Sequence, residues 1–168
     1  TITTGKPAVT DIVIFQGDEG KLLATAASVE SRSAHPLAQA VVQAAITRKL
    51  VWPDASDVQS VTGKGMHAQV ASAQVSIGNL RLFDQDGVPE PVRAKAQQME
   101  ARGKTTMLIR SNGDFLGLLA LADTPRPGMR EVFARLKALG IETAVMLTGD
   151  NAQVATAVAS IVGITDVR

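Results

Sequence analysis

Cysteine and tyrosine are absent from the 168-residue sequence, which contains one tryptophan and two histidines. The lack of cysteine excludes disulfides, thiol catalysis and thiolate metal sites from this segment, and it agrees with a reducing compartment. Two histidines are too few for a dedicated metal cage, so we expect no metal-binding residues. Aromatic residues make up only 3% of the chain, and a base-stacking platform of the kind that single-strand nucleic-acid binders use is therefore not expected.

Excess charge and long apolar runs are also missing. The net charge of +1 and the pI near 8.0 give no electrostatic reason to propose nucleic acid or anionic lipid as a partner. No window reaches the roughly 18 uninterrupted apolar residues of a membrane span, and the first residues do not resemble a signal peptide. What remains is 45% apolar content, enough for the core of one domain, or of one domain plus part of another.

The pattern of apolar residues predicts an α+β fold in which helices flank an antiparallel sheet. Asn112-Gly113, between two apolar runs, is a strong signal for a β-hairpin. Gly103 is expected to end the helix that precedes this hairpin. The predicted strands are 8–15, 58–61, 66–70, 74–77, 105–110 and 115–121, and the predicted helices are 22–29, 37–45 and 89–102.

The pattern changes after residue 122. Residues 123–128 contain two prolines and a glycine and are predicted to form a stiff, turn-rich connector. A helix at 129–139, a strand at 143–147 and a helix at 152–162 follow, in the order typical of a parallel α/β layer. The C-terminal segment is therefore expected to be an incomplete α/β unit.

The stretch from Glu30 to Pro36 joins the first two predicted helices and carries a carboxylate, two hydroxyls and an imidazole. Pro36 suits the first position of a helix because its φ is fixed and it has no N–H to leave unpaired. Ser33 or His35 would then lie at the helix N-terminus, where free N–H groups favour a polar or anionic ligand such as a nucleotide. A simple N-cap followed by proline is the alternative, and the spacing alone favours it.

Two further motifs have both a binding and a structural interpretation. Gly63-Lys64-Gly65, between two predicted strands, would let the backbone approach a flat ligand. For the motif alone, however, a glycine turn with a solvated lysine is the favoured explanation. Thr148, Gly149 and Asp150 follow an apolar strand and precede a helix. They are placed to hold a phosphoryl group, or to form a helix N-cap.

The run from Gly103 to Thr106 looks like the end of a Walker A loop, but two features exclude that interpretation. Gln98 stands where the motif requires another glycine. The run also leads from a helix into a strand, whereas a P-loop leads from a strand into a helix. His67, in a predicted strand, is expected to be a surface histidine.

Six motifs together resemble the heavy-metal-transporting P-type ATPases, and the resemblance covers essentially the whole chain. The Ser-x-His-Pro motif separates this branch from other P-type pumps. In chain order the motifs are residues 1–7 (Thr-Ile-Thr-Thr-Gly-Lys-Pro), Ser33-x-His35-Pro36, Gly63-x-Gly65, Gly78-Asn79, Asp123-x-x-Arg126-Pro127 and residues 146–151 (Met-Leu-Thr-Gly-Asp-Asn).

The resemblance implies a nucleotide-binding domain inserted into a phosphorylation domain. Residues 1–7 would be a remnant of the phosphorylation domain and hinge, residues 8–121 the nucleotide-binding domain, and residues 122–168 a partial phosphorylation domain of the haloacid-dehalogenase type. ATP would be the ligand, with Mg²⁺ held by residues outside this segment. The implied nucleotide-binding residues are Glu30, Ser33, His35, Pro36, Gly63, Gly65, Gly78 and Asn79, with adenine against His35.

The catalytic aspartate of the family lies in an Asp-Lys-Thr-Gly-Thr motif whose last threonine corresponds to Thr1, so we expect no catalytic residue within the matched segment. Thr148, Gly149 and Asp150 match a family motif that contacts the transferred phosphoryl group, and Asp123 marks the hinge. One departure is Ser72, which stands where the family often has glycine. The implied partners are ATP or ADP and the remaining domains of the pump, without nucleic acid or membrane insertion of this segment.

The implied whole protein is a metal-exporting pump in a bacterial plasma or inner membrane, with this segment on the cytoplasmic side. The run 30–36 is more similar to the zinc/cadmium/lead group than to the copper group, and copper export is the alternative. A stand-alone adenine-nucleotide sensor is a further alternative. A haloacid-dehalogenase phosphatase is disfavoured, because Asp84-Gln85-Asp86 follows a short predicted helix rather than ending a strand.

Overall fold

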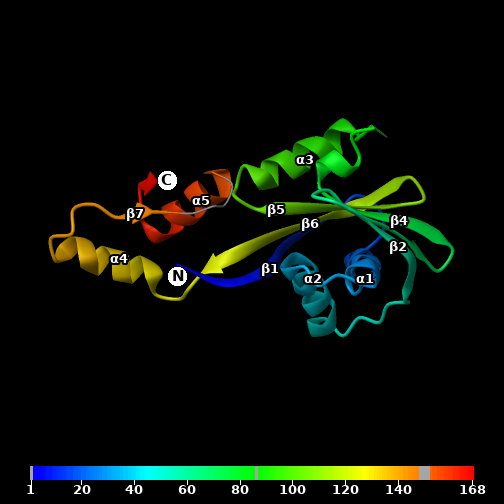
Figure 1. Cartoon of the computed structure of the whole chain (residues 1–168), viewed down its shortest axis with the longest axis horizontal. Helices are drawn as coiled ribbons and strands as arrows, with labels where there is room; N and C mark the ends of the chain where they lie inside the picture. Colours follow the sequence, from blue (N-terminus) through cyan, green and yellow to red (C-terminus); the bar gives the residue numbers. More distant parts are fainter. Residues whose placement is uncertain (1, 86, 148–151) are drawn as a thin grey trace.

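The computed structural model describes residues 2–85, 87–147 and 152–168 and consists of a large sheet with helices on both faces and a smaller C-terminal unit (Figure 1). The elements are β1 (Thr3–Ile14), α1 (Glu19–Glu30), α2 (Pro36–Thr47), β2 (Ala55–Val61), β3 (Gly65–Val70), β4 (Ala73–Gly78), the 3₁₀ turn η1 (Leu80–Leu82), α3 (Glu90–Glu100), β5 (Thr105–Ser111), β6 (Asp114–Pro125), α4 (Met129–Ala138), β7 (Val145–Met146), α5 (Ala152–Val162) and β8 (Asp166–Val167).

The large sheet has the strand order β1-β6-β5-β4-β3-β2, and every neighbouring pair in it is antiparallel. Helices α1 and α2 cover one face and α3 covers part of the other (Figure 1). Successive side chains of β5 alternate between these layers: Met107 and Ile109 pack with α1 and α2, whereas Leu108 packs with α3. The predicted α+β fold with an antiparallel sheet is confirmed.

β1 begins earlier and β6 ends later than predicted, because the start of β1 pairs with the end of β6. Thr3 pairs with Pro125 and Pro7 with Asp123, so β1 begins before residue 8 and β6 continues past residue 121. The prediction of a turn-rich connector was therefore wrong for residues 123–125. Long-range pairing outweighs the local turn preference of this stretch. Pro7 lies in the edge strand β1, and Pro125 lies beyond Leu121, the last residue of β6 that pairs with β5, so both prolines are at positions where proline is tolerated.

The Asp123 carboxylate reinforces the pairing of β1 with β6. It accepts hydrogen bonds from the backbone N–H of Gly5 at 3.1 Å and from the hydroxyl of Thr4 at 3.0 Å. Arg126 follows, and its Nε donates to the carbonyl of Thr3 at 3.1 Å. The start of β1 and the end of β6 are thus tied to each other where β6 leads into the C-terminal unit.

The C-terminal unit has its own small core and a parallel strand pair. β7 and β8 pair in parallel, connected through α5, which agrees with the predicted α/β order. The predicted strand 143–147 is shortened to Val145–Met146, and β8 was not predicted because two residues carry too little pattern to be recognised. Met146 packs there against α5 residues such as Val158 and Val162.

We expect amide hydrogens of residues 122–168 to exchange faster than those of residues 8–121. Helix α4 contains no buried residue, and Val132, Leu136 and Leu139 are exposed apolar side chains at helical spacing. Few buried contacts make local opening easier. Hydrogen exchange followed by mass spectrometry measures this difference, and equal protection in the two segments would contradict it.

Candidate functional site

A cavity of about 370 Å³ lies between the α1–α2 junction and the strands β2, β3 and β5. It brings together residues that are far apart in the sequence. Seven of the eight nucleotide-binding residues predicted from the sequence line it: Glu30, Ser33, His35, Gly63, Gly65, Gly78 and Asn79. Pro36 is not among the lining residues, and its contribution is to the start of α2.

His35 is the N-cap of α2, and Pro36 is the first residue of the helix. The Nδ1 atom of His35 accepts a hydrogen bond from the backbone N–H of Leu37 at 3.2 Å. In the neutral ring the proton therefore lies on Nε2, which remains available as a donor. The capping interpretation is correct for His35, but the same exposed imidazole also lines the cavity, so the two interpretations do not exclude each other.

Ser33 organises the short loop that connects α1 to α2. Its hydroxyl oxygen accepts from the backbone N–H of His35 at 3.2 Å. Its own N–H donates to the carbonyl oxygen of Glu30 at 2.9 Å. Ser33 thus fixes the position of both cavity-lining side chains on either side of it.

Glu30 is the last residue of α1, and only 4% of its surface is exposed. Burial raises the pKa of its carboxyl from 4.5 to about 7, because the charged form loses its hydration. Within the described part of the chain the carboxyl has no hydrogen-bonding or ion-pair partner, and it faces the cavity. In its protonated form it offers one donor and one acceptor, a pair that matches the edge of a heterocyclic base.

Gly63 and Gly65 are each required as glycine, but for different structural reasons. Gly65 of β3 lies directly opposite Gly78 of β4. A Cβ atom on Gly65 would collide with the carbonyl oxygen of Ile77 and lie 2.6 Å from the Cα of Gly78. Gly63 instead has a φ of +68° and open space around it, which is the requirement of a turn. Gly65 thus allows the close approach of β3 to β4, a requirement that the sequence motif did not predict.

Asn79 holds the turn between β2 and β3 in place. Its Nδ2 donates to the carbonyl of Gly63 at 2.9 Å, and its backbone N–H donates to the carbonyl of Lys64 at 2.9 Å. Arg81, which the sequence analysis did not single out, donates from Nη2 to the same Gly63 carbonyl at 3.0 Å. Asn79 is therefore a positioning residue for the Gly63–Gly65 turn.

The remaining walls of the cavity come largely from apolar side chains that carry no motif, including Leu37, Ala38, Val61, Met66 and Met107. Sequence alternation in β3 and β5 could have indicated their common face, but not that this face borders a cavity. No aromatic side chain is among the lining residues of the described segments. Thioether and aliphatic walls of this kind suit a flat heterocycle held without aromatic stacking.

The run that resembles a Walker A loop has a structural use. Lys104 forms an ion pair with Asp11, and this hydrogen bond lowers the pKa of the Asp11 carboxyl. The two threonines that follow, Thr105 and Thr106, line the cavity. Neither threonine was predicted as a site residue, because the run from Gly103 to Thr106 resembles part of a phosphate loop and carries no other motif.

Other predicted features lie elsewhere. Thr148, Gly149 and Asp150 are outside the described residues. His67 is half-buried, its Nδ1 lies 2.8 Å from the hydroxyl of Ser76, and it does not line the cavity. Residues 2–85, 87–147 and 152–168 contain no group of three His, Cys, Asp or Glu side chains placed to hold a metal ion. None of the helices in these ranges has the length and apolar content needed to cross a bilayer.

Comparisons with known proteins give consistent matches over the whole chain. The family model of the haloacid dehalogenase-like hydrolases matches residues 1–168. The chain is 39% identical, over 98% of its length, to a probable copper-exporting P-type ATPase V of Mycobacterium tuberculosis, and 34% identical, over 100%, to a probable cadmium-transporting ATPase of Staphylococcus aureus.

A solved structure gives a match of similar quality. The crystal structure of a zinc-transporting PIB-type ATPase in the E2.Pi state superposes with a TM-score of 0.88 at 36% identity, covering 100% of this chain and 27% of that one. The chain spans 22% and 24% of the lengths of the two relatives named above. The similarity therefore concerns one part of much longer proteins.

Proposed function

Since the chain belongs to the haloacid dehalogenase-like hydrolases, and its relatives are heavy-metal P-type ATPases, we propose that it is the ATP-binding cytoplasmic part of a heavy-metal-exporting P-type ATPase. The observation that carries the proposal is the single cavity that collects Glu30, Ser33, His35, the Gly63–Gly65 turn and Asn79. Identity to pumps over 98% or more of the chain supports this function over a stand-alone nucleotide sensor.

In this proposal residues 8–121 form the nucleotide-binding domain, residues 1–7 the hinge remnant, and residues 122–168 part of the phosphorylation domain. Adenine lies against the His35 ring, with its edge toward the Glu30 carboxyl. The apolar walls exclude water from the base, and the backbone of the Gly63–Gly65 turn follows the nucleotide outward. Thr148, Gly149 and Asp150 are assigned to the transferred phosphoryl group in the complete pump.

ATP hydrolysis in such a pump also uses Mg²⁺, which neutralises charge on the phosphates. The described residues do not fit a magnesium site, because no three carboxylate or imidazole side chains gather among them. We therefore assign no magnesium ligand to the described residues. The role of this chain is to bind the nucleotide and orient it.

The 168-residue chain is expected to bind ATP weakly, with a Kd from tens of micromolar to millimolar, roughly 4 to 6 kcal/mol. Replacing His35 with asparagine should weaken binding about three- to tenfold, because the ring contact is lost. Asparagine is a good N-cap, so α2 should remain intact. Isothermal titration calorimetry measures the affinity, and His35→Gln provides a second variant with a longer side chain.

Equal affinities of the wild-type chain and both His35 variants would remove His35 from the site. Far-ultraviolet circular dichroism serves as the control, because unchanged helical content separates a lost contact from a lost cap. If the wild-type chain binds neither ATP nor ADP at millimolar concentration, the proposed function itself is wrong.

The same chain is expected to form no phosphoenzyme. No residue of this segment occupies the position of the family's nucleophilic aspartate. Without a positioned nucleophile, binding the nucleotide accelerates phosphoryl transfer very little. Incubation with radiolabelled ATP followed by acid precipitation should give no protein-bound label. A signal that maps to a residue of this chain would overturn the assignment.

The relatives do not agree on the exported ion, since their names include copper, cadmium and zinc. The zinc/cadmium/lead group is our proposal, based on the run 30–36, and copper is the alternative. A nucleotide pocket has no contact with the cargo, so the test requires the full-length protein. ATPase activity stimulated by copper and not by zinc or cadmium would reverse the preference.

The proposal also defines the surroundings of this chain. The partners are ATP or ADP and the other domains of the pump, and the chain itself is placed on the cytoplasmic side of a bacterial membrane. The exposed apolar face of α4, with Val132, Leu136 and Leu139, agrees with a segment that packs against further polypeptide.

A further inference from the structure

We propose that Lys64 and Arg81 form the phosphate-binding side of the cavity and make it selective for nucleoside di- and triphosphates over the free nucleoside. This inference rests on the proposed nucleotide-binding function. It adds two cationic residues that no sequence motif assigned to ligand binding.

Lys64 lies between the two glycines of the β2–β3 turn and lines the cavity with an exposed side chain. The turn is anchored, because the carbonyls of Gly63 and Lys64 both accept hydrogen bonds from Asn79. The base of the Lys64 side chain is thus fixed while its ammonium group is free to reach a ligand. An ammonium on a flexible stem binds phosphate as a point charge.

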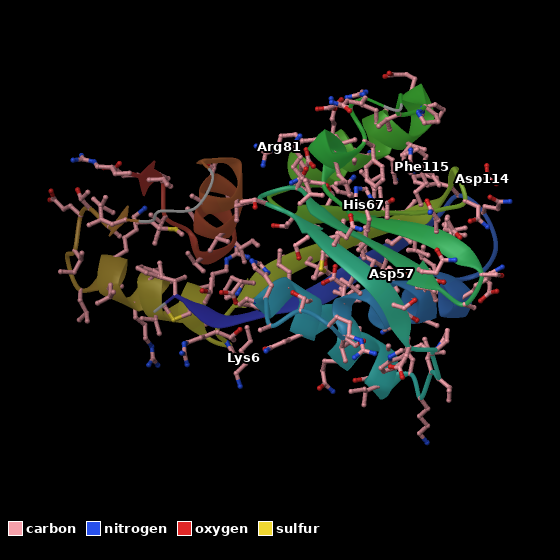
Figure 2. The ribbon with its side chains drawn as sticks, turned by 45° about the vertical axis from the view of Figure 1, so that its right-hand side comes forward. Lys6, Asp57, His67, Arg81, Asp114 and Phe115 are labelled. Carbon is pink, nitrogen blue, oxygen red and sulfur yellow. The ribbon has the colours of Figure 1, made fainter. Side chains whose placement is uncertain are left out.

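Arg81 brings a second cation to the same turn from η1. Its Nη2 donates to the carbonyl of Gly63 at 3.0 Å, which sets the guanidinium beside a cavity-lining residue. One such bond leaves the other N–H groups of the guanidinium as donors, and their planar geometry matches phosphate oxygens. In Figure 2, the Arg81 side chain lies at the opposite end of the sheet from Asp114.

In the described ranges of the chain, the ion pairs involve other residues, and neither Lys64 nor Arg81 has a carboxylate partner. The acidic group of the cavity, Glu30, comes from the different wall formed by α1, and it is buried and uncharged below neutral pH.

The cavity therefore has a mostly apolar part that contains the Glu30 carboxyl, and a cationic edge where Lys64 lines it and Arg81 lies beside the same turn. A nucleoside phosphate has the same division, with an apolar base and a polyanionic chain.

The test measures four ligands on the full 168-residue chain by calorimetry: adenosine, AMP, ADP and ATP, each at low and at high salt without magnesium. Lys64→Gln and Arg81→Gln should each reduce ATP and ADP affinity about three- to tenfold and leave adenosine affinity unchanged. The salt dependence of ATP binding should also become weaker. Lys64→Arg and Arg81→Lys, which keep the charge, should restore most of the affinity.

Lys137→Gln is the matched control, because it removes one exposed lysine from α4, far from the cavity lining. It should leave all four affinities unchanged. If Lys64→Gln reduces adenosine and ATP binding equally, the residue acts through the turn and the inference is wrong. If adenosine binds while both neutral variants keep full ATP affinity, the inference fails and the proposed function stands. If no ligand binds the wild-type chain, both fail.

Discussion

Gly65→Ala is expected to reduce the free energy of unfolding by about 3 kcal/mol or more, and to prevent folding if the chain is only marginally stable. The new Cβ would overlap the backbone of β4 at Ile77 and Gly78. That backbone cannot move aside without breaking the pairing of β3 with β4, which is in register from Gly65 to Val70. A flexible side chain could rearrange at little cost, but a strand backbone cannot.

Gly63→Ala is the matched control from the same turn. Its Cβ would meet no atom within 4 Å, so only the positive φ is unfavourable, at about 1 kcal/mol. Urea unfolding followed by fluorescence measures both variants, and the signal comes from Trp52 alone, since the chain has one tryptophan and no tyrosine. Equal stability losses in the two variants would show that β3 and β4 do not approach as closely as described.

Glu30→Gln is expected to stabilise the chain by about 3 kcal/mol at pH 8 and to have no effect near pH 4. The carboxyl pKa is raised from 4.5 to about 7 in the folded state because of burial. Between these values the folded chain holds a proton that the unfolded chain has released. Stability therefore falls as pH rises through this range, by about 1.4 kcal/mol per unit, and levels off above pH 7.

The measurement is the free energy of urea unfolding of the wild-type chain and of Glu30→Gln at intervals from pH 4 to pH 8. The difference between the two curves should grow with pH over the window from 4.5 to about 7. Glutamine has nearly the same shape and cannot ionise, so the cavity walls should be preserved. Parallel curves would contradict the pKa assigned to Glu30.

The two predictions together indicate that the cavity is maintained at a cost in stability. Burial raises the pKa of the Glu30 carboxyl to about 7, so its ionised form destabilises the fold as the pH approaches neutrality. An apolar residue at the end of α1 would avoid this penalty. Sites that violate the rules of folding in this way are commonly functional, which agrees with the proposed role of Glu30 in binding the base.

Local sequence rules were sufficient for the helices around the site. The apolar spacing predicted α1 and α2, and Pro36 correctly marked the start of α2 with His35 or Ser33 before it. These features depend on residues within one or two helical turns of each other. The N-cap bond from Leu37 to the His35 ring is likewise a contact between near neighbours.

Strand lengths were less predictable, because they depend on distant partners. Residues 3–7 and 122–125 have weak strand patterns of their own, and they become strands by pairing with each other. The short strands β7 and β8 similarly need α5 to bring them side by side. Propensity within a window cannot register such pairing.

By itself the sequence determined the α+β class, the helix boundaries near His35 and the set of motif residues, because periodicity and capping act over a few positions along the chain. Only the tertiary structure decided that Gly65 must face Gly78, that Glu30 is buried beside the cavity, and that Arg81 reaches the turn that contains Lys64. Each of these depends on the distance between separate chain segments, and that distance is set by the packing of the sheet against α1 and α2 rather than by any local preference.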